Sequence, residues 1–529
     1  MGEKMDSSQL QIIIAMALYM ALIIGVGVAY AKRANQNSAQ YFIGGRSLGP
    51  WVAAMSAEAS DMSGWLLMGL PGVAYWCGLA DAAWTAIGLA IGTYLNWLLV
   101  SQRLRSYSVV AGNAITIPDF FSNRFREKKK VLLTIASVMI LVFFSVYVGS
   151  CFVTCGKLFA ALFGADYHAM LLLGALFVIA YTLLGGFLAE SVSDFIQGMI
   201  MICALAVVLA VGLASAGGPG AVLDNLRDIP GFVEFFGMAA PVVDADKVQQ
   251  IAGGTAQFGE ALDYGFLTVL STLSWGLGYF GMPQVLLRFI AIRRRSELKL
   301  SRRVATLWCV LSLSAAVFIG LVGRHLFPVS PELLTAGGAE NIFIVVARTL
   351  FHPLFAGIVM SAILAAAISS SDSYLLIAAS SVSKNIFQGI LKKDATDRHV
   401  MRVTRMTLLV ISVFGILIAW DEASVIFRVV SFAWAGFGAT FGPLMLFSLF
   451  WKRVSHAGAV AGMLSGGGMV FVWYFLLRPL GGIWGIYELL PAFLFSCIVI
   501  VAVSLATKAP GGEILEDFEK AKTPDKFGF

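Results

Sequence analysis

Charged residues are scarce in this sequence of 529 residues. Asp, Glu, Lys and Arg together make up 13%, whereas hydrophobic residues make up 59%. A soluble domain carries about 25% charged residues, so the surface of a water-exposed protein of this size could not be covered. The apolar residues also form blocks of about 20 or more, long enough to cross a hydrocarbon core of roughly 30 Å. The composition excludes a large soluble enzyme and predicts an integral membrane protein.

Histidine and cysteine are also rare. The five histidines lie in predicted loops or near the ends of predicted spans, so no His/Glu pair or Ser–His arrangement falls inside the membrane. Cys151 and Cys155 have helical i, i+4 spacing but no accompanying His or further Cys, which is typical of small core residues rather than metal ligands or a disulfide. A Walker-type glycine loop is missing as well. An enzyme within the membrane and an ATP-driven pump are therefore disfavoured.

The apolar blocks predict an all-α protein with thirteen transmembrane helices. The first block, residues 10–30, lacks the basic start and small-residue cleavage site of a signal peptide, so we expect a permanent span. One transmembrane domain, residues 9–507, is expected between a short segment 1–8 and a tail 508–529. The predicted spans centre near residues 20, 62, 90, 145, 174, 203, 277, 316, 367, 411, 436, 466 and 496.

The basic residues are distributed unevenly between the two sides of the predicted bundle. Of the 37 Lys and Arg residues, 28 fall in one set of connecting segments and 7 in the other. The positive-inside rule then places the N-terminus outside and the tail in the cytoplasm. The net charge of +6 is read as this topological bias, with contacts to anionic lipid headgroups, and not as a sign of nucleic-acid binding.

Two predicted spans contain residues that interrupt a helix. The second holds Asp61, Ser63 and Gly64 in the middle of an apolar segment, where an unpaired carboxylate costs at least a few kcal/mol. The seventh, residues 275–283, holds three glycines and a proline. Close helix packing alone could explain such glycines. The two segments lie five spans apart, however, and this pairing favours a transport site at the middle of the membrane.

A ladder of hydroxyl groups marks the ninth span. Ala366, Ser369, Ser370 and Ser373 share one helical face by i+3 and i+4 spacing. Neutral oxygens suit a hard monovalent cation, although serines also join helices to one another. Asp194 in the sixth span could face this ladder, or could cap a helix with Ser193.

Several motifs resemble the sodium/solute symporter family, and most of all those members that transport proline. The likeness runs from about residue 40 to residue 505. The motifs are Gly44-Gly45-Arg46-Ser47-Leu48-Gly49-Pro50, the segment from Ser60 to Gly72, Gly185-Gly186-Phe187-Leu188-Ala189, Trp275-Gly276-Leu277-Gly278-Tyr279-Phe280-Gly281 and Ala433-Trp434-Ala435-Gly436-Phe437-Gly438.

The resemblance implies a leucine-transporter-like core of two inverted five-helix repeats, about residues 50–217 and 263–452. One helix precedes the core, and two follow it in residues 454–507. It also implies uptake of L-proline with Na⁺ by alternating access across the bacterial cytoplasmic membrane. The implied main Na⁺ site comprises Ala59, Met62, Ala366, Ser369 and Ser370, with Asp61 as the carboxylate beside it. The implied solute pocket comprises Ser63, Gly64, Tyr147, Trp275, Tyr279 and Pro283.

This sequence departs from the pattern of its proline-transporting relatives at several positions. Glu58, Glu190, Asp372 and Met282 stand where a glycine, an apolar residue, a serine and a glutamine are expected. We therefore predict a second site for a cation or a proton at Asp194, Asp372 and Ser373. The added acids also leave open a basic amino acid as the solute, with Na⁺ or H⁺ coupling, or a gate in which Glu58 and Glu190 pair with arginines. An ion channel is disfavoured, because no carbonyl filter or ring of charges is visible.

Overall fold

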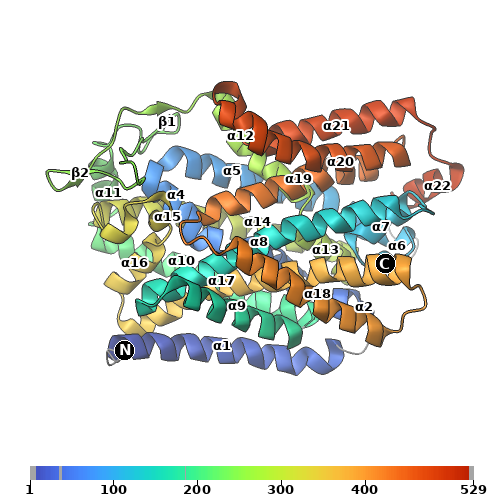
Figure 1. Ribbon diagram of the computed structural model, residues 1–529, viewed down its shortest axis with the longest axis horizontal. Helices are drawn as coiled ribbons and strands as arrows, with labels where there is room; N and C mark the ends of the chain where they lie inside the picture. Colours follow the sequence, from blue (N-terminus) through green and yellow to red (C-terminus); the bar gives the residue numbers. More distant parts are fainter. Residues whose placement is uncertain (1–6, 35–37, 185, 523–529) are drawn as a thin grey trace.

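The computed structural model describes residues 7–34, 38–184 and 186–522, and these residues are mostly helical (Figure 1). Most of segment 1–8, the end of tail 508–529 and Gly185 lie outside the described residues. The helices run roughly along the longest axis of the molecule, and α1 (Ser7–Ala34) lies along one side of the bundle. It packs against two other long helices, α10 (Phe187–Ser215) and α17 (Pro353–Ser380).

The first half of the chain contains one interrupted span and several continuous ones. Its remaining elements are α2 (Ser38–Ile43), η1 (Gly44–Arg46), α3 (Pro50–Asp61), η2 (Trp65–Gly69), α4 (Leu70–Cys77), α5 (Leu79–Leu95), η3 (Asn96–Val100), α6 (Ser101–Val110), α7 (Ile117–Arg124), α8 (Val131–Phe163), α9 (Tyr167–Leu184) and α11 (Pro219–Leu226). Two short antiparallel pairs follow, β1 (Gly237–Met238) with β4 (Leu262–Asp263) and β2 (Ile251–Ala252) with β3 (Thr255–Ala256).

The second half repeats the combination of one interrupted span with continuous ones. Its other elements are α12 (Phe266–Leu273), η4 (Ser274–Phe280), α13 (Pro283–Ala291), η5 (Arg295–Glu297), α14 (Leu298–Leu326), η6 (Pro331–Leu333), α15 (Ala336–Ala339), α16 (Ile342–Leu350), η7 (Ser381–Leu391), α18 (Asp397–Ile418), α19 (Ile426–Phe450), α20 (His456–Val472), η8 (Trp473–Leu477), η9 (Arg478–Leu480), η10 (Gly482–Gly485), α21 (Leu489–Ala506) and α22 (Gly512–Lys520).

Ten helices within the described residues are long and apolar enough to cross a membrane. Three shorter apolar helices, Trp65–Cys77, Tyr167–Leu183 and Phe266–Phe280, lie at or near the predicted centres 62, 174 and 277. Helices suit this environment because a hydrocarbon core offers the backbone no hydrogen-bonding partner, so each span must satisfy its own amides. A multi-pass helical membrane protein is thus confirmed.

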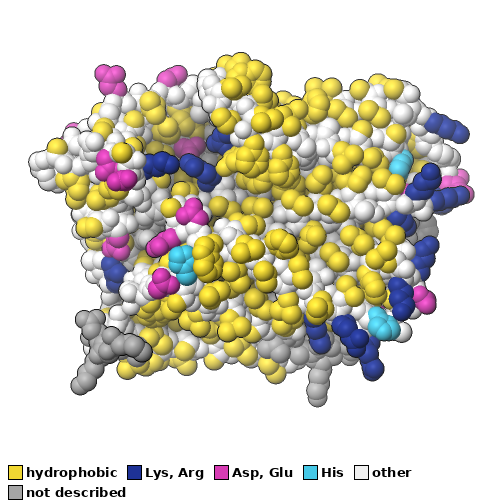
Figure 2. Space-filling model, viewed as in Figure 1, with side chains coloured by type: hydrophobic (Ala, Val, Ile, Leu, Met, Phe, Trp, Pro, Cys, Tyr) yellow, Lys and Arg dark blue, Asp and Glu magenta, His cyan; other side chains and the backbone are white. Residues whose placement is uncertain are grey.

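The charges gather at the two ends of the bundle and leave an apolar middle (Figure 2). Lys and Arg side chains concentrate at the end that carries α6, α7 and α22, here called the basic end. Helix α22 is held there by Phe518, which is buried, and by ion pairs from Arg126 to Glu513 and Asp517. The β-strands, α11 and α15 lie at the opposite end, here called the far end.

Candidate cation and solute site

The first helix break falls between α3 and η2. Helix α3 ends at Asp61, and Met62 leaves the helical conformation with φ −86° and ψ 76°. The chain resumes a helical course at Gly64 and continues through η2 into α4. A side chain could not replace the hydrogen at Gly64, because a Cβ there would lie 2.1 Å from Oγ1 of Thr154. The break therefore exposes backbone groups in the middle of the bundle and is fixed there by contact with α8.

The second break joins α12 to α13 through the 3₁₀ segment η4. Its glycines also allow close packing. A Cβ on Gly276 would lie 2.2 Å from the carbonyl oxygen of Gly88, and one on Gly278 would lie 1.9 Å from Nε1 of the Trp434 side chain. These glycines therefore serve both in the break and in packing, the two roles that the sequence left as alternatives. The breaks are neighbours in space, since Nε2 of Gln284 donates to Oδ1 of Asp61 at 3.1 Å.

Oxygen atoms from α3 and α17 converge beside the first break. The hydroxyl of Ser369 donates to the carbonyl of Ala59 at 2.8 Å, and that of Ser370 reaches the same carbonyl at 3.4 Å. Ser369 also lies 3.3 Å from the carbonyl of Ala366. This set of hydroxyl and carbonyl oxygens is the donor chemistry that hard cations prefer. Four of the predicted main-site residues thus meet, and Met62 stands three residues beyond Ala59 at the break.

Two acidic side chains near this oxygen cluster are fully buried. Oδ1 of Asp61 accepts from Gln284, whereas its Oδ2 has no hydrogen-bond partner within the described chain. Oε1 of Glu58 accepts from Nε1 of Trp97 at 3.3 Å. The hypothesis that Glu58 pairs with an arginine therefore does not match this structure, in which an indole is its partner. A buried carboxylate with a free oxygen favours a nearby cation.

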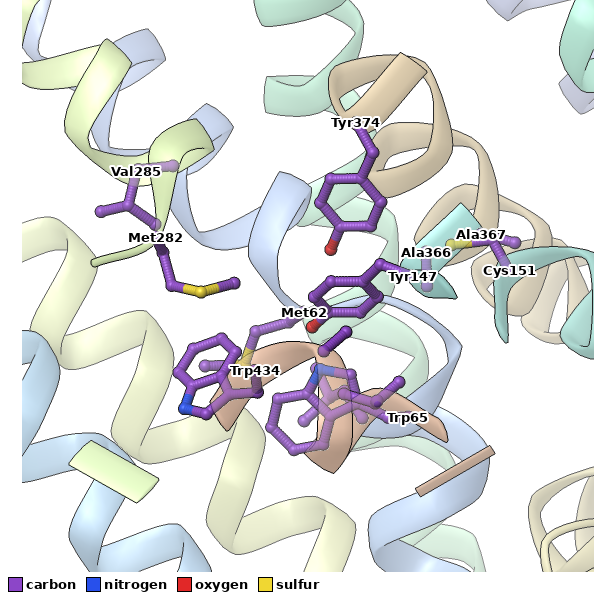
Figure 3. Packing of buried hydrophobic residues seen from close by; sticks show 14 of the residues in the cluster. Met62, Trp65, Tyr147, Cys151, Met282, Val285, Ala366, Ala367, Tyr374 and Trp434 are labelled. Atoms are coloured by element: carbon purple, nitrogen blue, oxygen red, sulfur yellow. The ribbon is translucent and has the colours of Figure 1, made fainter. Parts of the chain in front are cut away.

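Aromatic rings surround the two breaks (Figure 3). Tyr147 on α8 directs its hydroxyl to the carbonyl of Asp61 at 3.4 Å. Trp275 lies 6.3 Å from Trp65 between ring centroids, and Tyr279 meets Trp434 edge to face at 5.0 Å. These contacts gather three of the predicted pocket residues, Tyr147, Trp275 and Tyr279, around the breaks, and Ser63 and Gly64 belong to the first break itself. Pro283 begins α13 and lines a small cavity with residues of α7 and η7.

A charged network lies beside the hydroxyl ladder of α17. Arg288 on α13 is fully buried, and its Nη2 donates to Glu190, to Asp194 at 3.2 Å and to Ser373 at 2.8 Å. Its Nε donates to the hydroxyl of Ser56 at 3.0 Å. The sequence predicted that Asp194 and Ser373 lie together, but Arg288 was not among the predicted site residues. Its position inside a predicted span was the available signal, since buried charges in membranes are paired and functional.

Negative charge exceeds positive charge in this network. Glu190, Asp194 and Asp372 face one guanidinium, that of Arg288, and interact electrostatically with it. Oδ1 of Asp372 accepts from the backbone amide of Ser373 at 2.8 Å. Oδ1 of Asp194 and Oδ2 of Asp372 lack hydrogen-bond partners in the part of the chain that the structure describes. The network therefore has the charge and the free oxygens to hold one further cation or proton.

A cleft of about 1070 Å³ opens at the far end, and a buried ion pair lies at its inner side. Nζ of Lys157, one of the lining residues, is 2.8 Å from Glu340. Glu340 also accepts from the backbone amides of Ile426 and Phe427 at the start of α19. The ring of Phe427 lies against that of Trp275, with 5.1 Å between their centroids. These contacts link the buried ion pair to the start of α19 and to the aromatic rings at the second break.

Two neighbouring broken helices in a membrane bundle, beside an oxygen cluster and aromatic rings, are an arrangement typical of secondary transporters. The model of the sodium:solute symporter family matches residues 41–466. The chain belongs to this family, and it is a sodium-coupled solute symporter of the membrane.

Individual relatives agree with this assignment. The chain is 40% identical to the sodium/proline symporter of Staphylococcus aureus (strain USA300 / TCH1516), over 99% of this chain and 98% of that protein, and equally to that of strain JH1. A solved Na⁺-coupled sialic acid symporter in a substrate-bound outward-open state has a TM-score of 0.73 at 18% identity, covering 95% of this chain and 99% of that one. A nucleobase-cation-symport-1 family transporter in a closed conformation has a TM-score of 0.52 at 11% identity, covering 92% and 100%. These two likenesses show the fold.

Proposed function

We propose that this protein imports L-proline together with Na⁺ by alternating access. The observation that carries proline as the solute is the 40% identity, over nearly the whole length, to proteins named sodium/proline symporters. The site is compatible with it, because an aromatic enclosure suits the proline ring and hydroxyl or amide donors suit its carboxylate.

The proposal includes a topology and an architecture. The ten long and three shorter apolar helices act as thirteen spans, and the two broken helices are equivalent members of two inverted five-helix repeats. The basic end faces the cytoplasm and the far end faces outward, as the positive-inside rule requires. The cleft lined by Lys157 is then the outer vestibule, and the pair of Lys157 with Glu340 closes it.

The residues divide between the two transported species. Na⁺ binds to oxygens of Ala59, Met62, Ala366, Ser369 and Ser370, and Asp61 supplies negative charge beside it. Proline binds between the breaks, where Ser63 and Gly64 border both species. Tyr147, Trp275 and Tyr279 enclose the ring, and Pro283 fixes the start of α13 below it.

Uptake by purified protein in liposomes tests the choice of solute and ion. Labelled proline and lysine are supplied in turn under an imposed Na⁺ gradient or an imposed H⁺ gradient. We expect accumulation of proline with the Na⁺ gradient alone. Accumulation of lysine instead of proline, or proline uptake driven only by the H⁺ gradient, would refute the proposal.

The partners of the added acids bear on whether a basic amino acid is the solute. That alternative rests on the added acids Glu58, Glu190 and Asp372. Glu190 is paired with Arg288, and Glu58 accepts from Trp97. Glu190 therefore has a cation of its own, whereas Glu58 and Asp372 each keep one buried oxygen without a hydrogen-bond partner in the described chain. Proline remains the better proposal because of the identity to the sodium/proline symporters.

The main cation site predicts a selective effect of Ser369→Ala. Removing a hydroxyl ligand should raise the Na⁺ concentration for half-maximal proline uptake about tenfold or more, the range seen when groups that support a metal site are removed. Ser371→Ala is the matched control, because the Ser371 hydroxyl donates to Ala367 on its own helix at 2.5 Å. Equal Na⁺ dependence of the two variants in uptake assays would contradict the assignment.

We further propose that a second cation binds between Asp194 and Asp372, beside Arg288 and Ser373. Asp372→Ser removes one of the two free carboxylate oxygens, so we expect a lower Hill coefficient for Na⁺ and less charge moved per proline. Both are measured by flux and current on the same proteoliposomes. Asp397→Ser, in the first turn of α18, serves as the control. If Asp372→Ser leaves both quantities unchanged, the second site does not exist.

A further inference from the structure

Tyr374 is a buried tyrosine of α17 that the predicted pocket does not include. It lies four residues after Ser370, on the helical face that meets the first break. Its ring stacks on that of Tyr147, with 4.4 Å between centroids and 30° between planes, and on that of Phe144 at 4.9 Å. Figure 3 shows Tyr374 and Tyr147 next to each other, near Met62 and Met282. The stacking fixes where the Tyr374 hydroxyl points.

Too many donors converge on one backbone oxygen at this place. The carbonyl of Asp61 is approached by the Tyr374 hydroxyl at 3.5 Å and by the Tyr147 hydroxyl at 3.4 Å. Nε1 of Trp65 reaches it at 3.3 Å, and the amide of Ser63 at 3.1 Å. A carbonyl oxygen has two lone pairs, so it cannot satisfy four donors. The two tyrosine hydroxyls also hydrogen-bond to each other, which still leaves more donors than this oxygen can accept. The two hydroxyl contacts are also much longer than the usual 2.7–2.8 Å of an O–H···O bond.

Surplus donors at a binding site call for an acceptor from a ligand. A carboxylate offers about four acceptor positions on two oxygens and takes short, strong bonds from hydroxyl groups. We propose that Tyr374 binds the carboxylate of the transported solute, with its hydroxyl acting beside that of Tyr147. The proposal rests on the proposed function, since it takes an amino acid to be the solute. It adds α17 to the solute site, so one helix contacts Na⁺ through Ser369 and the solute through Tyr374.

Because Na⁺ and the solute share helix α17, their binding is coupled. Ser369, Ser370 and Tyr374 lie within six residues of one rigid helix, so an ion that positions the two serines also positions the Tyr374 hydroxyl. Binding of either species then favours the arrangement that the other needs, which is the physical content of coupling between sites.

Equilibrium binding of L-proline and L-prolinamide to detergent-purified full-length protein tests the inference. The variant Tyr374→Phe keeps the stacked ring and removes only the hydroxyl. We expect it to weaken proline binding about 10- to 100-fold, as for a lost hydrogen bond to a charged group, and prolinamide binding much less. Because the ratio of the two affinities comes from one sample, incomplete folding of the variant does not alter it. Binding of Na⁺ without solute should match the wild type.

The matched control is Tyr107→Phe, at the basic end. Tyr107 is also fully buried, and its hydroxyl has no hydrogen-bond partner within the described chain. This variant should bind proline as the wild type does. An unchanged proline-to-prolinamide ratio in Tyr374→Phe, or weakened Na⁺ binding without solute, would overturn the inference alone. Failure of the wild type to bind proline would instead refute the proposed function and the inference together.

Discussion

Replacement of Arg288 by methionine is expected to destabilise the folded protein by about 3–5 kcal/mol and to abolish uptake. The side chain is fully buried and pairs with Glu190 and Asp194, both of which are also buried. Methionine fills a similar volume but leaves Glu190, Asp194 and Asp372 without a cation. Loss of one partner from a buried ion pair carries a cost of this size, because the remaining charge stays desolvated. Thermal unfolding in detergent measures the loss.

Two further variants separate charge from packing at Arg288. Arg293→Met removes an exposed guanidinium that pairs with Glu297 at 2.9 Å. We expect the free energy of unfolding to change by less than about 1 kcal/mol. The triple variant of Arg288→Met with Glu190→Gln and Asp194→Asn also removes the charges of the two carboxylates that pair with Arg288, so it should recover a large part of the stability, although Asp372 keeps its charge. If Arg288→Met is no less stable than Arg293→Met, the buried network does not stabilise the fold.

Gly276→Ala in η4 is also expected to lower both the stability of the protein and its uptake strongly. A Cβ there would meet backbone atoms of α5, with the oxygen of Gly88 at 2.2 Å and Cα of Gly92 at 3.2 Å. Backbone cannot rotate away as a side chain can, so α5 and η4 must separate. We expect the free energy of unfolding to fall by about 3 kcal/mol and proline uptake to fall to near background.

Gly468→Ala in α20 is the matched control for this prediction. Within the described structure no heavy atom lies within 4 Å of the added Cβ, and alanine favours a helix over glycine. This variant should keep the wild-type melting temperature and uptake. A Gly276→Ala protein with both properties unchanged would show that the close approach of η4 and α5 is not required.

The sequence predicted the helices well, because the membrane imposes their length and composition. A span needs about 20 apolar residues and must satisfy its own backbone, so apolar blocks and helices coincide. The first break was predictable for a related reason. Asp61, Ser63 and Gly64 are expensive in hydrocarbon, and the chain leaves the helix there.

The partners of individual side chains could not be predicted in the same way. Arg288 pairs with residues 98 and 94 positions away, and sequence spacing does not show which helices pack together. Glu58 was open to an arginine partner, and only the fold brings Trp97 of η3 to it. Tyr374 was hidden by the serines before it, since its importance lies in a carbonyl that three other groups also approach. The ladder on α17 was visible, but its contact with Ala59 came from the resemblance.

In the proposed mechanism, Na⁺ and solute meet at the two broken helices. Proline binding to purified protein, titrated with Na⁺ and repeated with choline in its place, tests this most directly. Sites that share Asp61 and its neighbours must be coupled reciprocally, so Na⁺ should tighten proline binding at least tenfold and saturating proline should tighten Na⁺ binding by the same factor. Equal proline affinity in Na⁺ and in choline would show that Na⁺ and proline do not bind at a shared site.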